Sequence, residues 1–149
     1  MEALVDILKK HWNYDGFRPQ QLAVIESILA GKDTLALLPT GAGKSICFQV
    51  PTIYQRGICI VISPLIALMQ DQVKDLVSKN LKAVLLGSHL NTYEESIVFK
   101  DIEAKKYQFI YCSPEKLAQK HFQDLLNGLP IQLFAIDEAH CISQWGYDF

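Results

Sequence analysis

The strongest constraint on the fold is an alternation between short apolar runs rich in β-branched residues and longer segments with helical spacing. The runs are apolar at nearly every position, which is typical of parallel strands covered on both faces. The predicted strands are residues 34–38, 58–63, 83–86, 108–112 and 133–137. The predicted helices are residues 2–11, 44–54, 65–79, 93–105 and 114–127, with a loop over 12–19. This pattern predicts one doubly wound α/β domain over residues 1–149, built on a mainly parallel sheet with helices on both faces.

Two helices carry further local signals. Apolar residues at three-and-four spacing predict one buried face on the helix over 65–79. These residues are Leu65, Leu68, Met69, Val73, Leu76 and Val77. Ser113 followed by Pro114 is a typical helix start, because proline in the first turn loses no amide partner.

Composition limits the classes of function. Half of the 149 residues are hydrophobic and 20% are charged, as in an ordinary globular domain with one core. The net charge of −2 gives no general attraction to nucleic acid, so nucleic-acid binding would need local contacts. The four cysteines form no C-x-x-C pair and are expected to be reduced, most of them buried. The chain shows no signal peptide and no run of membrane-spanning length, so a cytoplasmic location and no membrane partner are expected.

A phosphate-binding loop is predicted between the first strand and the next helix. Such a loop needs small residues that let backbone amides approach phosphate oxygens, a lysine for the outer phosphates and a hydroxyl for magnesium. The residues of this kind are Thr40, Gly41, Ala42, Gly43, Lys44 and Ser45. Leu38 replaces the first glycine of the strict pattern. The alternative is a glycine turn beside a surface lysine, but the loop favours a nucleoside triphosphate site.

A pair of carboxylates follows the last predicted strand. Asp137 and Glu138 come at its C-terminal end, where open α/β sheets bind ligands. Together with the loop, they predict that Asp137 holds Mg²⁺ through water. Glu138 would then polarise the water that attacks the γ-phosphate. A solvated strand end is the alternative for the pair, and a core histidine is an equally open alternative for His140.

These motifs resemble the first motor lobe of the RecQ family of ATP-dependent DNA helicases in superfamily 2. The resemblance runs from Tyr14 to Phe149 and rests on YDGFRPQQ, LPTGAGKS and DEAHCISQWGYDF. It implies a RecA-like P-loop fold, ATP and Mg²⁺ as cofactors, and single-stranded or duplex DNA as the partner. It also implies that Tyr14 and Arg18 sandwich adenine while Gln21 bonds the edge of the base. The alternative is that Tyr14 and Phe17 are core aromatics and Arg18 is a surface charge.

The resemblance further implies an aromatic-rich loop, residues 143–149, that couples single-stranded DNA binding to hydrolysis. The DNA-contacting or coupling residues would be His140, Gln144, Trp145 and Phe149. Trp145 and Phe149 could stack on bases, or serve as hydrophobic contacts under the loop. Tyr147 replaces the histidine of most family members, which puts proton-dependent coupling there in doubt. Residues 63–65, 87–88 and 113–115 match segments that touch the DNA backbone, although strand ends and helix caps are the alternative.

The leading interpretation is therefore the ATP-binding lobe of a 3′-to-5′ DNA helicase, with the direction implied only by the resemblance. The alternatives are another superfamily 2 motor, such as an RNA helicase or a chromatin remodeller, and a non-catalytic nucleotide-binding module. The sequence lacks a second motor lobe and its arginine finger, so we expect the isolated chain to be inactive. The resemblance also implies a further strand beyond Phe149, lying between residues 34–38 and 133–137. We therefore expect both of these strands to have an open edge and the isolated chain to be marginally stable.

Overall fold

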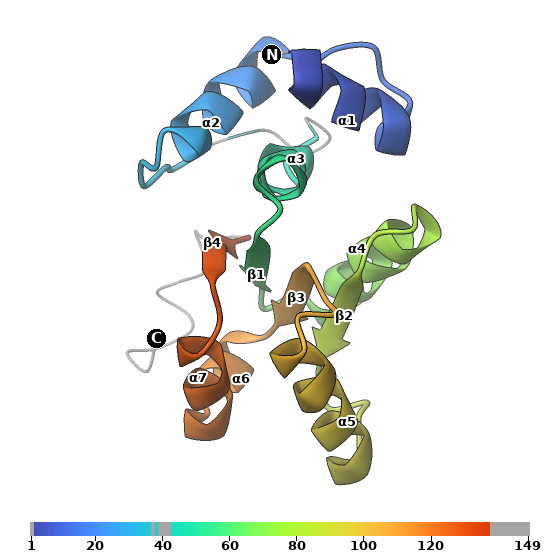
Figure 1. The fold of residues 1–149 in the computed structure, drawn as a ribbon, viewed down its shortest axis with the longest axis vertical. Coiled ribbons are helices and arrows are strands. Elements are labelled where there is room, and N and C mark those ends of the chain that lie inside the picture. The colour runs from blue at the N-terminus through green and yellow to red at the C-terminus, as the bar shows by residue number, and fades with distance from the viewer. Residues whose placement is uncertain (1, 37, 39–42, 138–149) are drawn as a thin grey trace. The chain divides into compact units, whose positions relative to one another are not determined.

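The computed structural model describes residues 2–36, 38 and 43–137 of the chain. These residues belong to two compact units, Met1–Arg56 and Gly57–Phe149 (Figure 1). Each unit has a hydrophobic core of its own.

The first unit consists of three helices, α1 (Glu2–Trp12), α2 (Pro19–Leu29) and α3 (Ile46–Gln55). Its core contains Leu4 and Leu8 from α1, Ile25 from α2, and Ile46 and Val50 from α3. Helix α2 was not among the predicted helices, although it begins at a proline, a residue well suited to the first turn. The predicted helices over 2–11 and 44–54 are confirmed to within two residues at each end.

The predicted strand over residues 34–38 is wrong for the part that the structure describes. Residues 34–36 and 38 adopt no strand, and Leu35 is 75% exposed. A strand is stabilised by hydrogen bonds to a neighbouring strand. None of the four strands in the described part of the chain pairs with this segment, so its apolar side chains alone do not make it a strand.

The second unit is built on a four-stranded sheet in the order β2-β3-β1-β4. The strands are β1 (Ile58–Ile62), β2 (Ala83–Leu86), β3 (Phe109–Cys112) and β4 (Ile131–Ile136), and every pair is parallel. Four predicted strands are thus confirmed. The central strands β1 and β3 are buried throughout, as their uninterrupted apolar sequences predict, whereas β4 alternates between half-buried and exposed residues.

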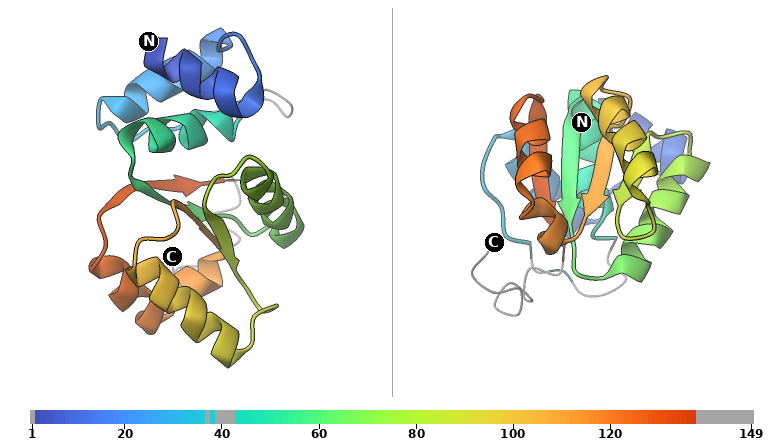
Figure 2. Two further views of the ribbon diagram at one scale, coloured as in Figure 1. Left: turned by 45° about the vertical axis from the view of Figure 1, so that its right-hand side comes forward. Right: turned by 90° about the horizontal axis from the view of Figure 1, so that it is seen from below.

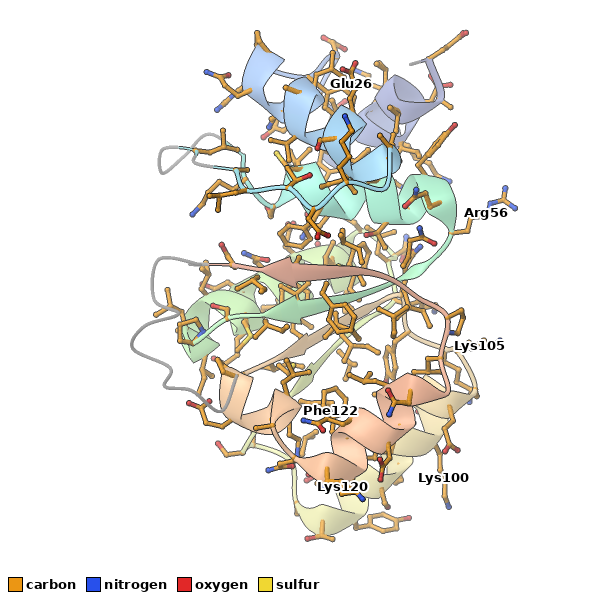
Figure 3. The ribbon with its side chains drawn as sticks, turned by 90° about the vertical axis from the view of Figure 1, so that its left-hand side faces the viewer. Glu26, Arg56, Lys100, Lys105, Lys120 and Phe122 are labelled. Carbon is orange, nitrogen blue, oxygen red and sulfur yellow. The ribbon has the colours of Figure 1, made fainter. Side chains whose placement is uncertain are left out.

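Helices cover both faces of this sheet (Figures 1 and 2). Helix α4 (Ile66–Ser78) covers one face, where the Tyr111 hydroxyl of β3 donates to Gln72 Oε1 at 2.7 Å. Helices α5 (Thr92–Glu103), α6 (Pro114–Leu117) and α7 (Lys120–Asn127) cover the other. Phe122 points from α7 toward the sheet and is fully buried (Figure 3). The fold class is therefore confirmed for this unit.

Two helix predictions need correction. Residues 114–127 form two helices, because Gln119 is extended (φ −74°, ψ 128°) between α6 and α7. The apolar residues Leu117 and Phe122 both pack on the core but are five positions apart, a spacing that one continuous helix does not place on one face. On α4, Met69 and Leu76 are buried as predicted, whereas Leu65 precedes the helix and is 45% exposed, and Val77 is 53% exposed.

Candidate nucleotide-binding site

The end of the predicted phosphate loop leads directly into α3. Gly43 has a positive φ of 71°, which only glycine adopts readily, and Ser45 is already helical (φ −64°, ψ −31°). The Cys47 N–H donates to the Lys44 carbonyl at 3.0 Å, which closes the first turn. Lys44 and Ser45 thus lie at a helix N-terminus, where backbone amides and the helix dipole favour phosphate. Thr40, Gly41 and Ala42 lie outside the described residues.

Gln21 links this loop to α2. Its Nε2 donates to the Gly43 carbonyl at 3.2 Å, and its Oε1 accepts from the Arg18 N–H at 2.9 Å. The Gly43 carbonyl can only accept a hydrogen bond and the Arg18 N–H can only donate one. These two partners therefore identify the Nε2 and Oε1 ends of the Gln21 amide. Only 4% of Gln21 is exposed, and a Cβ at position 43 would collide with its Nε2. The side chain of Gln21 therefore contributes to the position of the loop, and the sequence motif gave no indication of this contact.

The predicted adenine-binding residues are in different environments. Arg18 is exposed at the N-cap of α2 and is joined to Gln21 by the capping bond. Tyr14 is 55% exposed in the loop before α2. Phe17 is half-buried and packs on the core of the first unit, as the structural alternative predicts for this residue. The structure thus brings Arg18 and Gln21 together and leaves the ring of Tyr14 largely exposed.

Buried thiols lie near the loop and in the sheet. Cys47, Cys59 and Cys112 are buried and form no disulfide, which confirms the prediction for these three. Burial raises the pKa of Cys47 to about 11 and that of Cys112 to about 12. Both thiols are therefore neutral near pH 7 and are poor nucleophiles. Cys141 lies outside the described residues.

Asp137 follows β4 at the C-terminal end of the parallel sheet. Its N–H donates to the Ile62 carbonyl at 2.9 Å, and the residue is half-buried. Open α/β sheets bind ligands at this end of their strands. Glu138 and the predicted DNA-contacting residues His140, Gln144, Trp145 and Phe149 lie outside the described residues. Within the described ranges, no group of three or more potential metal-ligating residues is present.

The other predicted DNA-contacting segments follow β1, β2 and β3. Because the strands are parallel, these segments lie at the same C-terminal end of the sheet as Asp137. Ser63 is buried, and its Oγ accepts from the Leu65 N–H at 3.1 Å. Ser113 Oγ accepts from the Lys116 N–H at 3.2 Å, which confirms the predicted helix cap. Both hydroxyls are engaged in turns and caps. Ile66, the first residue of α4, is 51% exposed, although no sequence motif includes it.

Comparison with protein families assigns the chain to a class. The family model described as DEAD/DEAH box helicase matches residues 18–149. The chain therefore belongs to the DEAD/DEAH box helicase family. Its fold is similar to that of the DUF1998 helicase MrfA bound to DNA and AMPPNP (TM-score 0.75, 19% identity, 94% of this chain and 21% of that chain). This likeness supports a RecA-like α/β fold.

Curated relatives that resemble the chain include DNA helicases named RecS and RecQ. The chain is 45% identical to the probable ATP-dependent DNA helicase RecS of Bacillus subtilis, over all of this chain and 30% of that protein. It is 43% identical to the ATP-dependent DNA helicase RecQ of Synechocystis, over 99% of this chain and 31% of that protein. The chain thus spans about a third of the length of these relatives. No helix in the described parts of the chain is long and apolar enough to cross a membrane.

Proposed function

We propose that this chain is the ATP-binding lobe of a RecQ-like helicase that couples ATP hydrolysis to 3′-to-5′ unwinding of DNA. The observation that best supports this proposal is the entry of Gly43, Lys44 and Ser45 into α3, with Gln21 bonded to the Gly43 carbonyl. A chain of this sequence places an ammonium, a hydroxyl and helix amides at one helix N-terminus, which suits a polyphosphate. The relatedness to RecS and RecQ supports ATP and DNA as the substrates.

In this proposal each side chain has a separate role. Lys44 neutralises the outer phosphates, while Tyr14, Arg18 and Gln21 select adenine. Ser45 and Asp137 are the residues that would hold Mg²⁺, which supplies charge neutralisation at the phosphates when it is bound. Glu138 would polarise the water that attacks the γ-phosphate.

Phosphoryl transfer depends on positioned charges, and an arginine finger contributes on the order of a thousandfold or more to the rate. In the proposal this arginine comes from a second motor lobe. The bare chain should therefore bind ATP weakly and turn it over slowly. Robust ATP turnover by the 149-residue chain would contradict the proposal that a second motor lobe supplies the arginine.

The phosphate assignment is tested by isothermal titration with Mg-ATP. Lys44→Ala should abolish measurable binding, because the loop amides cannot replace the charge of the lysine. Lys32→Ala is a matched control, since Lys32 is an exposed lysine of the same unit. Unchanged ATP affinity in Lys44→Ala would refute the assignment.

Two alternatives are separated by further measurements on a two-lobed protein that contains this chain. RNA-stimulated hydrolysis that exceeds DNA-stimulated hydrolysis would favour an RNA helicase or another superfamily 2 motor. Nucleotide binding without hydrolysis would favour a non-catalytic module. In the same protein, Trp145→Ala should weaken the coupling between DNA binding and hydrolysis more than it weakens ATP binding.

A further inference from the structure

A groove of about 380 Å³ runs along β2, at the edge of the sheet that is farthest from Asp137 in the strand order. Helix α4 forms one wall through Val73 and Val77, and β2 forms the floor through Ala83 and Leu85. Figures 1 and 2 show α4 and β2 side by side. The groove lies wholly within the second unit.

The backbone of β2 has one open side in the described part of the chain. Its only neighbour in the sheet is β3, and the Lys82 carbonyl accepts from the Phe109 N–H at 3.0 Å. Alternate residues of a parallel strand turn their N–H and C=O groups to the same neighbour. The even-numbered residues of β2 therefore face β3, and Ala83 and Leu85 direct their N–H and C=O groups to the open side.

This edge carries few of the usual devices that prevent pairing with another strand: β2 is short, at four residues, and the exposed Lys82 precedes it, but the strand itself is uncharged. Natural edge strands carry charged residues, prolines or bulges, or are covered by a helix or a loop. The sequence of β2 is Ala-Val-Leu-Leu, with no charge and no proline, and it pairs with β3 without a bulge. Free backbone groups beside an apolar groove are the features that an added strand recognises, with alternate side chains entering the groove.

The charges around the groove indicate what kind of strand fits. Lys74 lies on its α4 side and His89 follows β2, while Lys82 precedes β2 and is exposed. No aspartate or glutamate is among the residues that line the groove. Helix α4 carries two acids, Asp71 and Asp75; neither lines the groove, and Asp75 is bonded to Lys79 at 2.6 Å. A segment with acidic residues between its apolar residues would therefore complement this rim.

We propose that the groove along β2 binds an extended segment of a partner protein with alternating apolar and acidic side chains, which adds a strand to the sheet. The segment would bond to the outward backbone groups of Ala83 and Leu85. Its apolar side chains would contact Val73 and Val77, and its carboxylates would lie near Lys74. A second copy of this chain fits less well, because pairing two β2 edges would bring like charges together. This inference does not depend on the nucleotide site.

The test uses the 149-residue chain and synthetic peptides of about eight residues, slightly longer than a typical strand. The first peptide alternates valine with glutamate. The second replaces glutamate with lysine, and the third keeps the first sequence with alternate backbone nitrogens methylated. Fluorescence anisotropy should detect binding of the first peptide only, and hydrogen exchange should slow at the Ala83 and Leu85 amides.

Two pairs of variants locate the site. Val77→Asp should weaken binding by about tenfold or more, because it removes an apolar contact and repels the peptide. Ile97→Asp is the matched control, since Ile97 is an exposed aliphatic residue on α5. Lys74→Glu should shift the preference toward the lysine peptide, whereas Lys100→Glu on the outer side of α5 should not (Figure 3).

Several outcomes would overturn the proposal. These are equal binding of the acidic and basic peptides, undiminished binding of the methylated peptide, or no binding at all. Concentration-dependent dimerisation that Val77→Asp abolishes would assign the groove to a second copy. Displacement of the peptide by a single-stranded oligonucleotide would assign it to nucleic acid. The peptide comparison uses the unaltered chain, so it decides the question even if a variant fails to fold.

Discussion

Replacing Gln21 with alanine tests whether its amide holds the phosphate loop to α2. The substitution removes the bond from the Arg18 N–H at 2.9 Å and the bond to the Gly43 carbonyl at 3.2 Å. Each such bond contributes about 0.5–1.5 kcal/mol net. Because Gln21 is only 4% exposed, the lost amide also leaves a space that its neighbours must fill. We expect the free energy of unfolding to fall by about 1–3 kcal/mol.

Urea denaturation followed by circular dichroism measures this loss. Gln20→Ala is the control, because Gln20 is an exposed glutamine in the same turn of α2 and should change stability by less than about 0.5 kcal/mol. Gln21→Glu separates the two bonds. It keeps an acceptor for Arg18 but loses the donor and places a carboxylate against the Gly43 carbonyl. Equal stability of the Gln21→Ala and Gln20→Ala variants would refute the reasoning.

Nucleotide affinity then distinguishes a structural role of Gln21 from a role in base selection. If Gln21 bonds the adenine edge, Gln21→Ala should reduce the preference for ATP over GTP. An equal loss of affinity for both nucleotides would mean that Gln21 acts only by positioning the loop. The stability measurement is independent of this outcome, because it needs no ligand.

Three further predictions concern the second unit. The Lys116 ammonium, at 2.6 Å, lowers the pKa of Glu95 below its ordinary value of 4.5. Glu95→Gln should therefore lower the free energy of unfolding by about 1–2 kcal/mol near neutral pH. The difference from the parent chain should vanish as pH falls through the lowered pKa, and urea denaturation at several pH values measures it. Gly57→Ala should lower the thermal unfolding midpoint, because a Cβ there would collide with the side chain of Gln132 near the start of the β1–β4 pairing. An unchanged midpoint would show that β4 can shift to accept the Cβ without a loss of stability. In β4, the amides of Phe134 and Ile136, which face away from β1, should exchange hydrogen faster than the amides of Leu133 and Ala135, which face β1. Equal strong protection would contradict an open edge in the described part of the sheet.

The parallel sheet was largely predictable because its strands are apolar at nearly every position. The bounds of β2 are the predicted residues 83–86, and β1 and β3 differ from prediction by one residue at one end. Local pattern does not reveal where a segment finds its hydrogen-bonding partner, so residues 34–36 and 38 were predicted to lie in a strand but adopt none. The break at Gln119 was also missed, because it depends on how Leu117 and Phe122 reach the same core.

The candidate site was predictable to a similar degree. The motif correctly predicts that Gly43, Lys44 and Ser45 enter a helix, because small residues and a helical pattern follow each other in the sequence. The contact between Gln21 and Gly43 joins residues 22 positions apart, and no local spacing encodes it. The prediction that Gln21 contacts adenine rests on the family resemblance, and the bonds from its amide to protein backbone do not test it.

The two edges of the sheet differ in a way that bears on stability and on binding. At β4, Phe134 is 52% exposed and Ile136 is 38% exposed, and their N–H and C=O groups face away from β1. Apolar side chains beside unpaired backbone groups promote association with any strand of suitable shape. The β2 edge instead has an apolar groove lined in part by Lys74, with the exposed Lys82 before the strand, and in our proposal these charges select partners by charge as well as by shape. We therefore expect β4 to dominate non-specific aggregation of the isolated chain, and β2 to be the edge that discriminates between partners.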